Sequence, residues 1–188
     1  CQSFLNLVTY ARGEDYLAPM YREMHKQNKF KGVTWQLKVT DFENAVPSLK
    51  TKNILDFGCG PLGGVAQELG DRIIPYDPYV EKFSSKPWGK KFSVIHSSDV
   101  LEHMTWAEIQ SFLLNAKNSK VEYIFLVIST RKAGKDLPNG ANAHIMVKPG
   151  KWWLRNIGIE LGSNFIPTYA RNDLLRREVI LCFQRGNG

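Results

Sequence analysis

Short apolar runs recur from residue 53 onward, and each of them ends in a polar or glycine-rich turn. The runs at residues 53–57, 72–77 and 92–96 predict β-strands, and the unbroken apolar run at 121–128 is typical of a strand buried on both faces. Apolar residues at helical spacing between the last two runs predict a helix with one face toward the core: Trp106, Ile109, Phe112, Leu113 and Ala116. This alternation of strand and helix favours an α/β fold with a mainly parallel sheet.

The two ends of the chain add elements of a different kind. Residues 14–29 have the spacing of an amphipathic helix, and a second helix is expected within 33–50, ending near Pro47. Near the other end, apolar residues around 165–169 and 179–183 predict an antiparallel hairpin that closes the sheet. The first helix could be a lid over a ligand or only a packing helix, and the sequence leaves both open.

Two connections in the middle of the chain differ in length from those of a regular α/β domain. Residues 78–91 are too few for a helix, a strand and a second helix, so the usual third strand is predicted to be missing or vestigial. Residues 129–143 form a long loop after a central strand, and such loops are often functional. The expected fold is therefore a three-layer, Rossmann-like α/β sandwich with helices on both faces and an antiparallel C-terminal hairpin.

Composition limits the class of protein. A chain of 188 residues with 43% hydrophobic residues is most simply one domain, and no apolar run approaches the roughly 20 residues of a membrane span. The three cysteines have no ligand spacing, so neither a disulfide framework nor a metal site is predicted. With no secretory signal at the N-terminus, a reducing cytoplasm is expected. The net charge of +7 fits either a nucleic-acid partner or a solvated surface, and the dispersal of the basic residues favours the surface.

The strongest chemical signal is the turn after the first strand, where Asp56 is followed by Gly58, Cys59 and Gly60. Glycines in this arrangement allow the backbone to turn tightly and to approach a ligand, as in dinucleotide-binding proteins. A carboxylate beside the turn disfavours a pyrophosphate but attracts a ligand that carries an ammonium and a sulfonium. S-adenosylmethionine (SAM) is such a ligand.

The second strand ends in an acid in the same way. Asp77 follows Asp56 by about 20 residues, the interval at which an acid accepts hydrogen bonds from ribose hydroxyls in a nucleotide-binding βαβ unit. Asp99 ends the next strand and is expected at the same crevice, either as a ligand contact or as the N-cap of a short helix.

These motifs resemble those of the class I SAM-dependent methyltransferases. The segment 56–60, Asp-Phe-Gly-Cys-Gly, resembles motif I, and the segment 98–104, Ser-Asp-Val-Leu-Glu-His-Met, is similar to the one that follows the fourth strand in many members. A narrower resemblance is to small phage and bacterial methyltransferases without a settled substrate, and it rests on Tyr21, Met24, His25, Asn142, Ala143, His144, Trp152 and Trp153.

The resemblance implies a SAM-binding domain over residues 1–188, with an N-terminal helical lid at about 14–50. The residues expected to bind SAM are Asp56, Gly58, Cys59, Gly60, Asp77, Pro78, Tyr79, Ser98, Asp99 and Val100. Two histidines, His144 and then His103, are the candidates for a general base or for a group that orients the acceptor, since a neutral imidazole can accept a hydroxyl proton.

The acceptor is expected to be a small molecule or a glycan. The motifs used for amino and C5 methylation of nucleic acids are absent after the fourth strand, which makes a nucleic acid the less favoured acceptor. An RNA ribose or cap stays open as an acceptor, and so does a non-catalytic SAM-binding subunit. The oligomeric state is left open as well.

Overall fold

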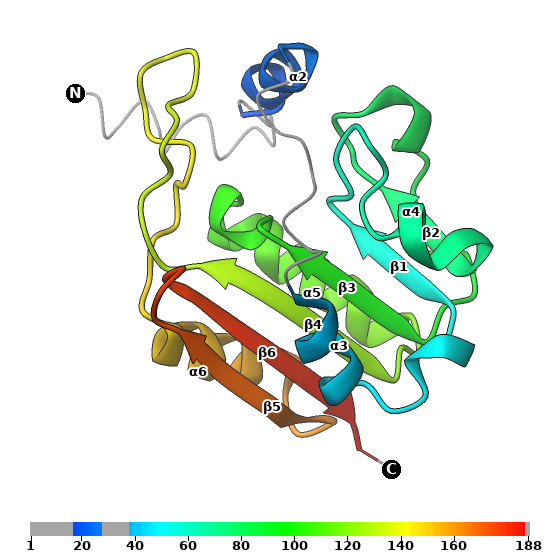
Figure 1. The fold of residues 1–188 in the computed structure, drawn as a ribbon. Coiled ribbons are helices and arrows are strands. Elements are labelled where there is room, and N and C mark those ends of the chain that lie inside the picture. Colours follow the sequence, from blue (N-terminus) through cyan, green and yellow to red (C-terminus); the bar gives the residue numbers. More distant parts are fainter. Residues whose placement is uncertain (1–16, 28–37, 187–188) are drawn as a thin grey trace.

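A computed structural model describes residues 17–27 and 38–186 of the chain (Figure 1). They contain one six-stranded sheet with the strand order β2-β1-β3-β4-β6-β5. Strands β1 to β4 are parallel, and the last two join as an antiparallel hairpin that pairs with β4 through β6. The strands are β1 (Ile54–Phe57), β2 (Ile73–Tyr76), β3 (Val94–Ser98), β4 (Tyr123–Ser129), β5 (Phe165–Asp173) and β6 (Glu178–Arg185).

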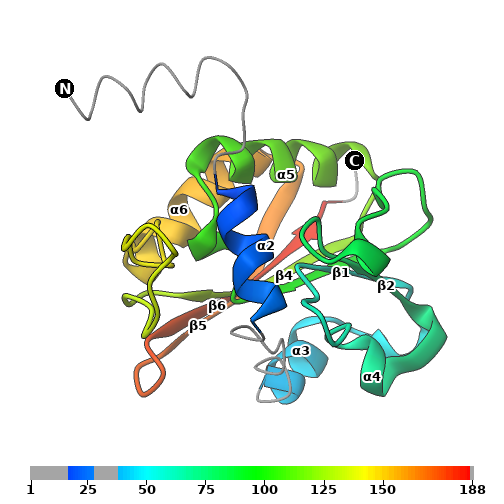
Figure 2. The same ribbon diagram turned by 90° about the horizontal axis from the view of Figure 1, so that it is seen from above.

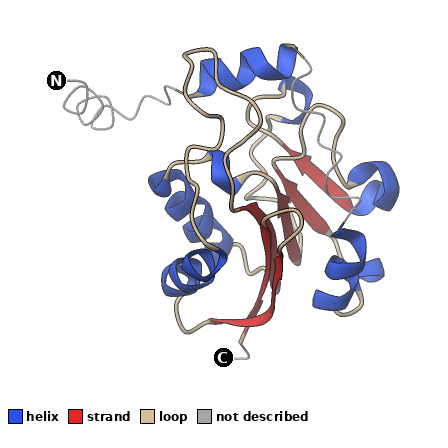
Figure 3. Cartoon of the chain, turned by 60° about the vertical axis from the view of Figure 1, so that its left-hand side comes forward, coloured by secondary structure: helices blue, strands red, loops and turns tan. Residues whose placement is uncertain are grey.

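Helices cover both faces of this sheet, as Figures 2 and 3 show. Helices α5 (Trp106–Asn118) and α6 (Gly150–Leu161) lie on one face, and α3 (Val39–Ala45) and α4 (Ala66–Leu69) lie on the other. Strand β4 is buried along its whole length because alternate side chains enter the two cores: Ile124 and Leu126 pack toward α5, and Phe125 and Val127 toward α3. The predicted three-layer α/β fold is confirmed.

Helix α5 begins after Thr105, which caps its N-terminus. Thr105 and Glu108 form a capping box, in which each side chain satisfies a backbone N–H of the other. The predicted apolar face is buried, apart from the partly buried Trp106, which packs edge-on against Trp152 of α6. Of the two adjacent tryptophans, Trp153 is fully buried in the core, so both rings serve to join α6 to the sheet and to α5.

The connection after β2 contains no strand, as the short interval predicted. Residues 77–93 form turns and one 3₁₀ turn, Glu81–Phe83, which leaves β2 at the edge of the sheet. Strand β3, in contrast, extends to Ser98, two residues beyond the predicted end.

The N-terminal helices are shorter than expected within the described residues. Helix α2 covers Ala18–Lys26, and α3 ends at Ala45, before Pro47. The remaining parts of the predictions, at 14–16 and 28–37, lie outside the described residues.

Helix α2 lies across the carboxyl ends of the parallel strands and does not pack on either face of the sheet (Figures 1 and 3). Its apolar side chains Leu17, Tyr21 and Met24 form a small separate core with Leu137 and Ala143 of the long loop after β4. None of the described helices has both the length and the apolar character that crossing a membrane requires.

Candidate active site

The glycine turn lies between β1 and α4, at the carboxyl end of the central strands. Gly58 and Gly60 have φ angles of 80° and 67°, which side chains with a Cβ rarely adopt. The N–H groups of Gly58 and Cys59 both donate to the carbonyl of Tyr76, at 2.8 and 3.1 Å. A Cβ on Gly58 would clash with Val100, so the turn packs directly on the end of the neighbouring strand.

Asp56 supports this turn from below. Its side chain is 3% exposed; Oδ2 accepts the N–H of Val65 at 3.0 Å, and Oδ1 lies 2.7 Å from Nδ1 of His96. Gly64 has no room for a Cβ because the Asp56 carboxylate occupies that space. Both oxygens of Asp56 are thus bonded within the protein, and the carboxylate fixes the shape of the turn; its attraction to a cationic ligand stays a prediction.

Asp77 ties the end of β2 to the turn. Its Oδ2 accepts the N–H of Gly60 at 3.0 Å, and its Oδ1 accepts the N–H of Tyr79 at 2.9 Å. Burial raises the pKa of this carboxyl above its usual value, although the two N–H donors and the nearby His25 act in the other direction. Nε2 of His25, on α2, lies 4.0 Å from Oδ2. The side chain of His25 is only 12% exposed, so it lies largely buried at the end of β2.

The residues that follow Asp77 separate into those beside the turn and those in the core. Tyr79 stacks on Tyr21 of α2, with ring centroids 5.5 Å apart, whereas Pro78 is exposed. Phe83 packs over Gly63, next to the turn. Trp88 packs among core rings, with Phe57 and Phe112.

At the end of β3, Ser98, Asp99 and Val100 are partly buried. Asp99 has a φ of 55°, and its N–H donates to the carbonyl of Val127 at 3.0 Å. The 3₁₀ turn that follows, η5 (Leu101–His103), has Val100 at its N-cap and no side-chain cap, so the interpretation of Asp99 as a helix cap is wrong.

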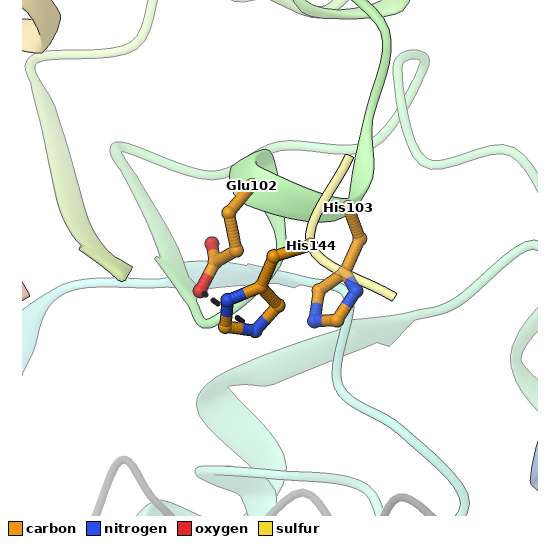
Figure 4. A group of neighbouring side chains, drawn as sticks. All are labelled: Glu102, His103 and His144. Atoms are coloured by element: carbon orange, nitrogen blue, oxygen red, sulfur yellow. Dashed lines mark ion pairs between the residues drawn. The ribbon is translucent and has the colours of Figure 1, made fainter. Parts of the chain in front are cut away.

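The two candidate histidines meet although 40 residues separate them in the chain. His103 belongs to η5, and His144 is brought beside it by the loop after β4, so that the ring centroids are 4.7 Å apart (Figure 4). Asn142 shapes this loop: its side chain exchanges hydrogen bonds with the backbone of Ala133 and accepts the N–H of His144. Both histidines bond to backbone carbonyls through Nδ1, His103 to Ala143 at 2.8 Å and His144 to Arg131 at 2.6 Å.

Charge around the histidines is unusual. Burial and the neighbouring His144 lower the pKa of His103 to about 3, and burial also lowers the pKa of His144. Both rings are therefore neutral at pH 7. Glu102 is fully buried next to them, and its burial, with Asp99 nearby, raises its pKa well above the usual range.

Tyr21 connects the residues around Asp77 and Tyr79 with the two histidines. Its ring lies 5.5 Å from that of Tyr79 and 5.6 Å from that of His103, and its hydroxyl oxygen is 3.0 Å from the carbonyl oxygen of His103 and 2.9 Å from that of Ala143. Helix α2 thus covers the ends of β2 and β3 at once, at the position expected of a lid.

Three residues of this site were not predicted to be functional: Glu102, Tyr21 and His96. Glu102 and Tyr21 lay within the quoted motifs but received no role, and the polar position of Glu102 before a helical segment gave no sign of complete burial. His96 lies in a strand that is otherwise read as apolar, and only its pairing with Asp56 across the sheet gives it a purpose.

Comparison with known proteins bears on the fold. No protein-family model matches the sequence, and no curated protein matches it either. Solved structures do match. The DhpI–SAH complex superposes with a TM-score of 0.56 at 13% identity, over 91% of this chain and 96% of the other. The fold is that of SAM-dependent methyltransferases.

Two further solved structures with this methyltransferase fold differ in the acceptor that their names state. Magnesium protoporphyrin IX methyltransferase from Synechocystis PCC 6803, with bound SAM, has a TM-score of 0.50 and 12% identity, over 93% of this chain and 86% of its own. An rRNA methylase from Escherichia coli has a TM-score of 0.51 and 10% identity, over 81% of this chain and 65% of its own.

Proposed function

We propose that this protein transfers the methyl group of SAM to a nucleophilic atom of a small molecule or a glycan. The observation that carries the proposal is the position of the glycine turn: it follows the central strand β1 and is bonded to an acid, Asp77, at the end of the adjacent strand β2. In open parallel sheets, ligands bind at this end of the strands. The fold shared with methyltransferases that bind SAM or SAH supports the same ligand here.

In this proposal the turn residues Gly58, Cys59 and Gly60 approach SAM with their backbone. Asp77 accepts hydrogen bonds from the ribose hydroxyls, and Tyr79 and Pro78 lie beside the adenine. Ser98, Asp99 and Val100 form the opposite wall. Asp56 holds the turn in place.

Methyl transfer is an in-line displacement at a carbon that its sulfonium already activates, so holding the acceptor in line supplies much of the acceleration. His144 and His103 are proposed on the acceptor side. Their lowered pKa values leave them neutral at pH 7 and able to orient an acceptor hydroxyl, although a pKa of about 3 makes His103 a weak base.

RNA is the second candidate acceptor, favoured by the net charge of +7 and by the likeness to an rRNA methylase. A third possibility, a non-catalytic SAM-binding subunit, would share the turn and lack turnover. We also propose a reducing, cytoplasmic location, in which Cys59 and Cys182, both buried free thiols, need no partner.

Calorimetry tests the ligand first. SAM and SAH should bind with micromolar affinity, and NAD and FAD should not; tighter binding of NAD would overturn the proposal. Methyl-labelled SAM incubated with metabolite, glycan and RNA pools then tests the acceptor. Label in a small molecule or glycan supports the proposal, label in RNA favours the second candidate, and SAM binding with no SAH released from any pool favours the subunit.

A further inference from the structure

Three side chains with metal-binding atoms converge on the acceptor side of the site: Glu102, His103 and His144. One donor atom from each lies within 4.8 Å of the other two, and Figure 4 shows His144 between Glu102 and His103. They come from two segments, η5 and the loop after β4, and backbone bonds hold these segments together, including one from the N–H of Met146 to the carbonyl of Glu102 at 3.0 Å.

The hydrogen bonds of the two histidines fix the nitrogen that each can offer. A backbone carbonyl only accepts, so the Nδ1 atoms that contact Ala143 and Arg131 must carry the protons. The lone pair of each neutral ring is then on Nε2, and Nε2 of His144 lies 4.0 Å from Oε1 of Glu102. Metal-binding histidines are oriented in this way, with the second ring N–H donated to a carbonyl.

Glu102 gives an independent indication of a cation. Its Oε1 accepts the N–H of Ser129 at 3.0 Å, but its buried Oε2 has no hydrogen-bond partner among the described residues. Within that part of the chain the only ion-pairing group within 4.0 Å of Glu102 is His144, and Asp99 and Glu178 add negative charge nearby. Burying an ionised carboxylate without a cation is unfavourable, so a bound cation would stabilise the ionised form of Glu102.

We propose that Glu102, His103 and His144 bind one divalent transition-metal ion. Two imidazoles with one carboxylate suit Mn²⁺, Fe²⁺, Co²⁺ or Zn²⁺ better than Mg²⁺ or Ca²⁺, which prefer oxygen ligands. Metal–nitrogen and metal–oxygen bonds are about 2.0–2.2 Å long, so the three donors draw together when the ion binds. Three protein ligands leave coordination positions open for water or for an acceptor oxygen.

The consequence for chemistry rests on the proposed methyl transfer. An acceptor hydroxyl next to the ion has a lowered pKa and loses its proton to solvent water without a side-chain base. Its oxygen then forms a bond to the methyl carbon while the carbon–sulfur bond breaks, and the bonding pair returns to sulfur to give SAH. His144 and His103 act in this reaction as ligands and not as proton acceptors.

Titration with Co²⁺ tests the site without SAM or any acceptor. The full chain, treated with chelator and dialysed, is titrated with Co²⁺ and followed by visible absorption and calorimetry. We expect one equivalent to bind with micromolar affinity, and Mg²⁺ to bind at least about 100-fold more weakly. Glu102→Gln, His103→Gln and His144→Gln should each weaken Co²⁺ binding by at least about tenfold.

The control is His25→Gln, which removes a histidine of equal burial from the same side of the molecule. The side chains of His25 and His144 are 12% and 13% exposed; Nε2 of His25 lies 4.0 Å from Asp77, and His25 is not one of the three converging donors, although its charge acts on His103. This variant should bind Co²⁺ like the wild type. Circular dichroism of each variant shows whether it is folded, and Glu102→Gln, which removes a buried charge, keeps the test valid if a histidine variant unfolds.

Failure of the wild type to bind one equivalent of Co²⁺, or equal binding by the folded Glu102→Gln variant, would overturn the metal site. The proposed function is tested separately: SAM binding and methyl transfer that persist in excess chelator would refute the role of the ion but leave the methyltransferase intact. Stoichiometric Co²⁺ binding by a protein that does not bind SAM would support the site and refute the function.

Discussion

The two sides of the candidate site are built by different means. On the cofactor side, residues 54–79, a buried carboxylate and backbone N–H groups hold a glycine turn against the sheet, and the bonds join residues that are near in sequence or on adjacent strands. On the acceptor side, η5, the loop after β4 and helix α2 meet through side chains that reach backbone carbonyls.

Because of this difference, we expect the cofactor side to be rigid and the acceptor side to determine which acceptor binds. The cofactor side shares its stability with the core, because Asp56 and His96 are inside the sheet. Helix α2 has its own small core with Leu137 and Ala143, so we expect it to open without loss of the main fold, whereas η5 is held in the main core by Leu101. Changes on the first side should therefore act on stability, and changes on the second on local motion and acceptor chemistry.

The largest effect is expected from Asp56→Ala. It breaks the buried pair with His96 and removes the acceptor of the Val65 N–H, which should lower the free energy of unfolding by about 3–5 kcal/mol in urea titrations. A stable Asp56→Ala protein that has lost SAM binding would instead support the direct attraction between Asp56 and SAM that the sequence predicts.

Gly64→Ala should come next, and Gly140→Ala is its matched control. Both glycines have positive φ angles, 52° and 80°, but only Gly64 would place its Cβ against a neighbouring side chain, that of Asp56, whereas Gly140 faces open space. Backbone strain costs about 1–2 kcal/mol in each variant. Gly64→Ala should lose more than this in urea titrations and should also weaken SAM binding; equal losses in both would show that the turn can move away from Asp56.

A smaller effect on stability, together with a loss of SAM affinity, is expected from Asp77→Ala, which also removes the acceptor of the Gly60 and Tyr79 N–H groups. Loss of charge-assisted hydrogen bonds to the ribose should cost about 1.5–3 kcal/mol of SAM binding, measured by calorimetry. Unchanged affinity in a folded variant would reduce Asp77 to a residue that shapes the turn through Gly60 and Tyr79.

Tyr21→Phe should have the smallest effect and a local one. It keeps the ring stack on Tyr79 but removes the hydroxyl contacts to the carbonyls of His103 and Ala143, which are worth about 1 kcal/mol. Hydrogen exchange of the α2 amides should become faster while the urea midpoint changes little. A large fall in the urea midpoint would show that helix α2 unfolds together with the rest of the protein.

The sequence predicted the cofactor side better than the acceptor side, for a physical reason. A turn of Asp56, Gly58 and Gly60 between two apolar strands is a local pattern, and the absence of a strand after β2 follows from the short interval after Asp77. The pairing of Asp56 with His96, and of Glu102 with His144, depends on the distance between segments 40 or more residues apart. Chemical type alone therefore did not reveal that Asp56 holds the turn, and it gave Glu102 no role.

The missing strand beyond β2 has a consequence for association between molecules. It leaves β2 as one edge of the sheet, and β5 is the opposite edge. An exposed edge can pair with a strand of another chain. Each edge contains a proline, Pro75 in the four-residue β2 and Pro167 in β5, where the register also shifts. Because proline lacks an N–H and an irregular edge cannot continue a ladder, both edges resist the strand-to-strand growth that leads to aggregates.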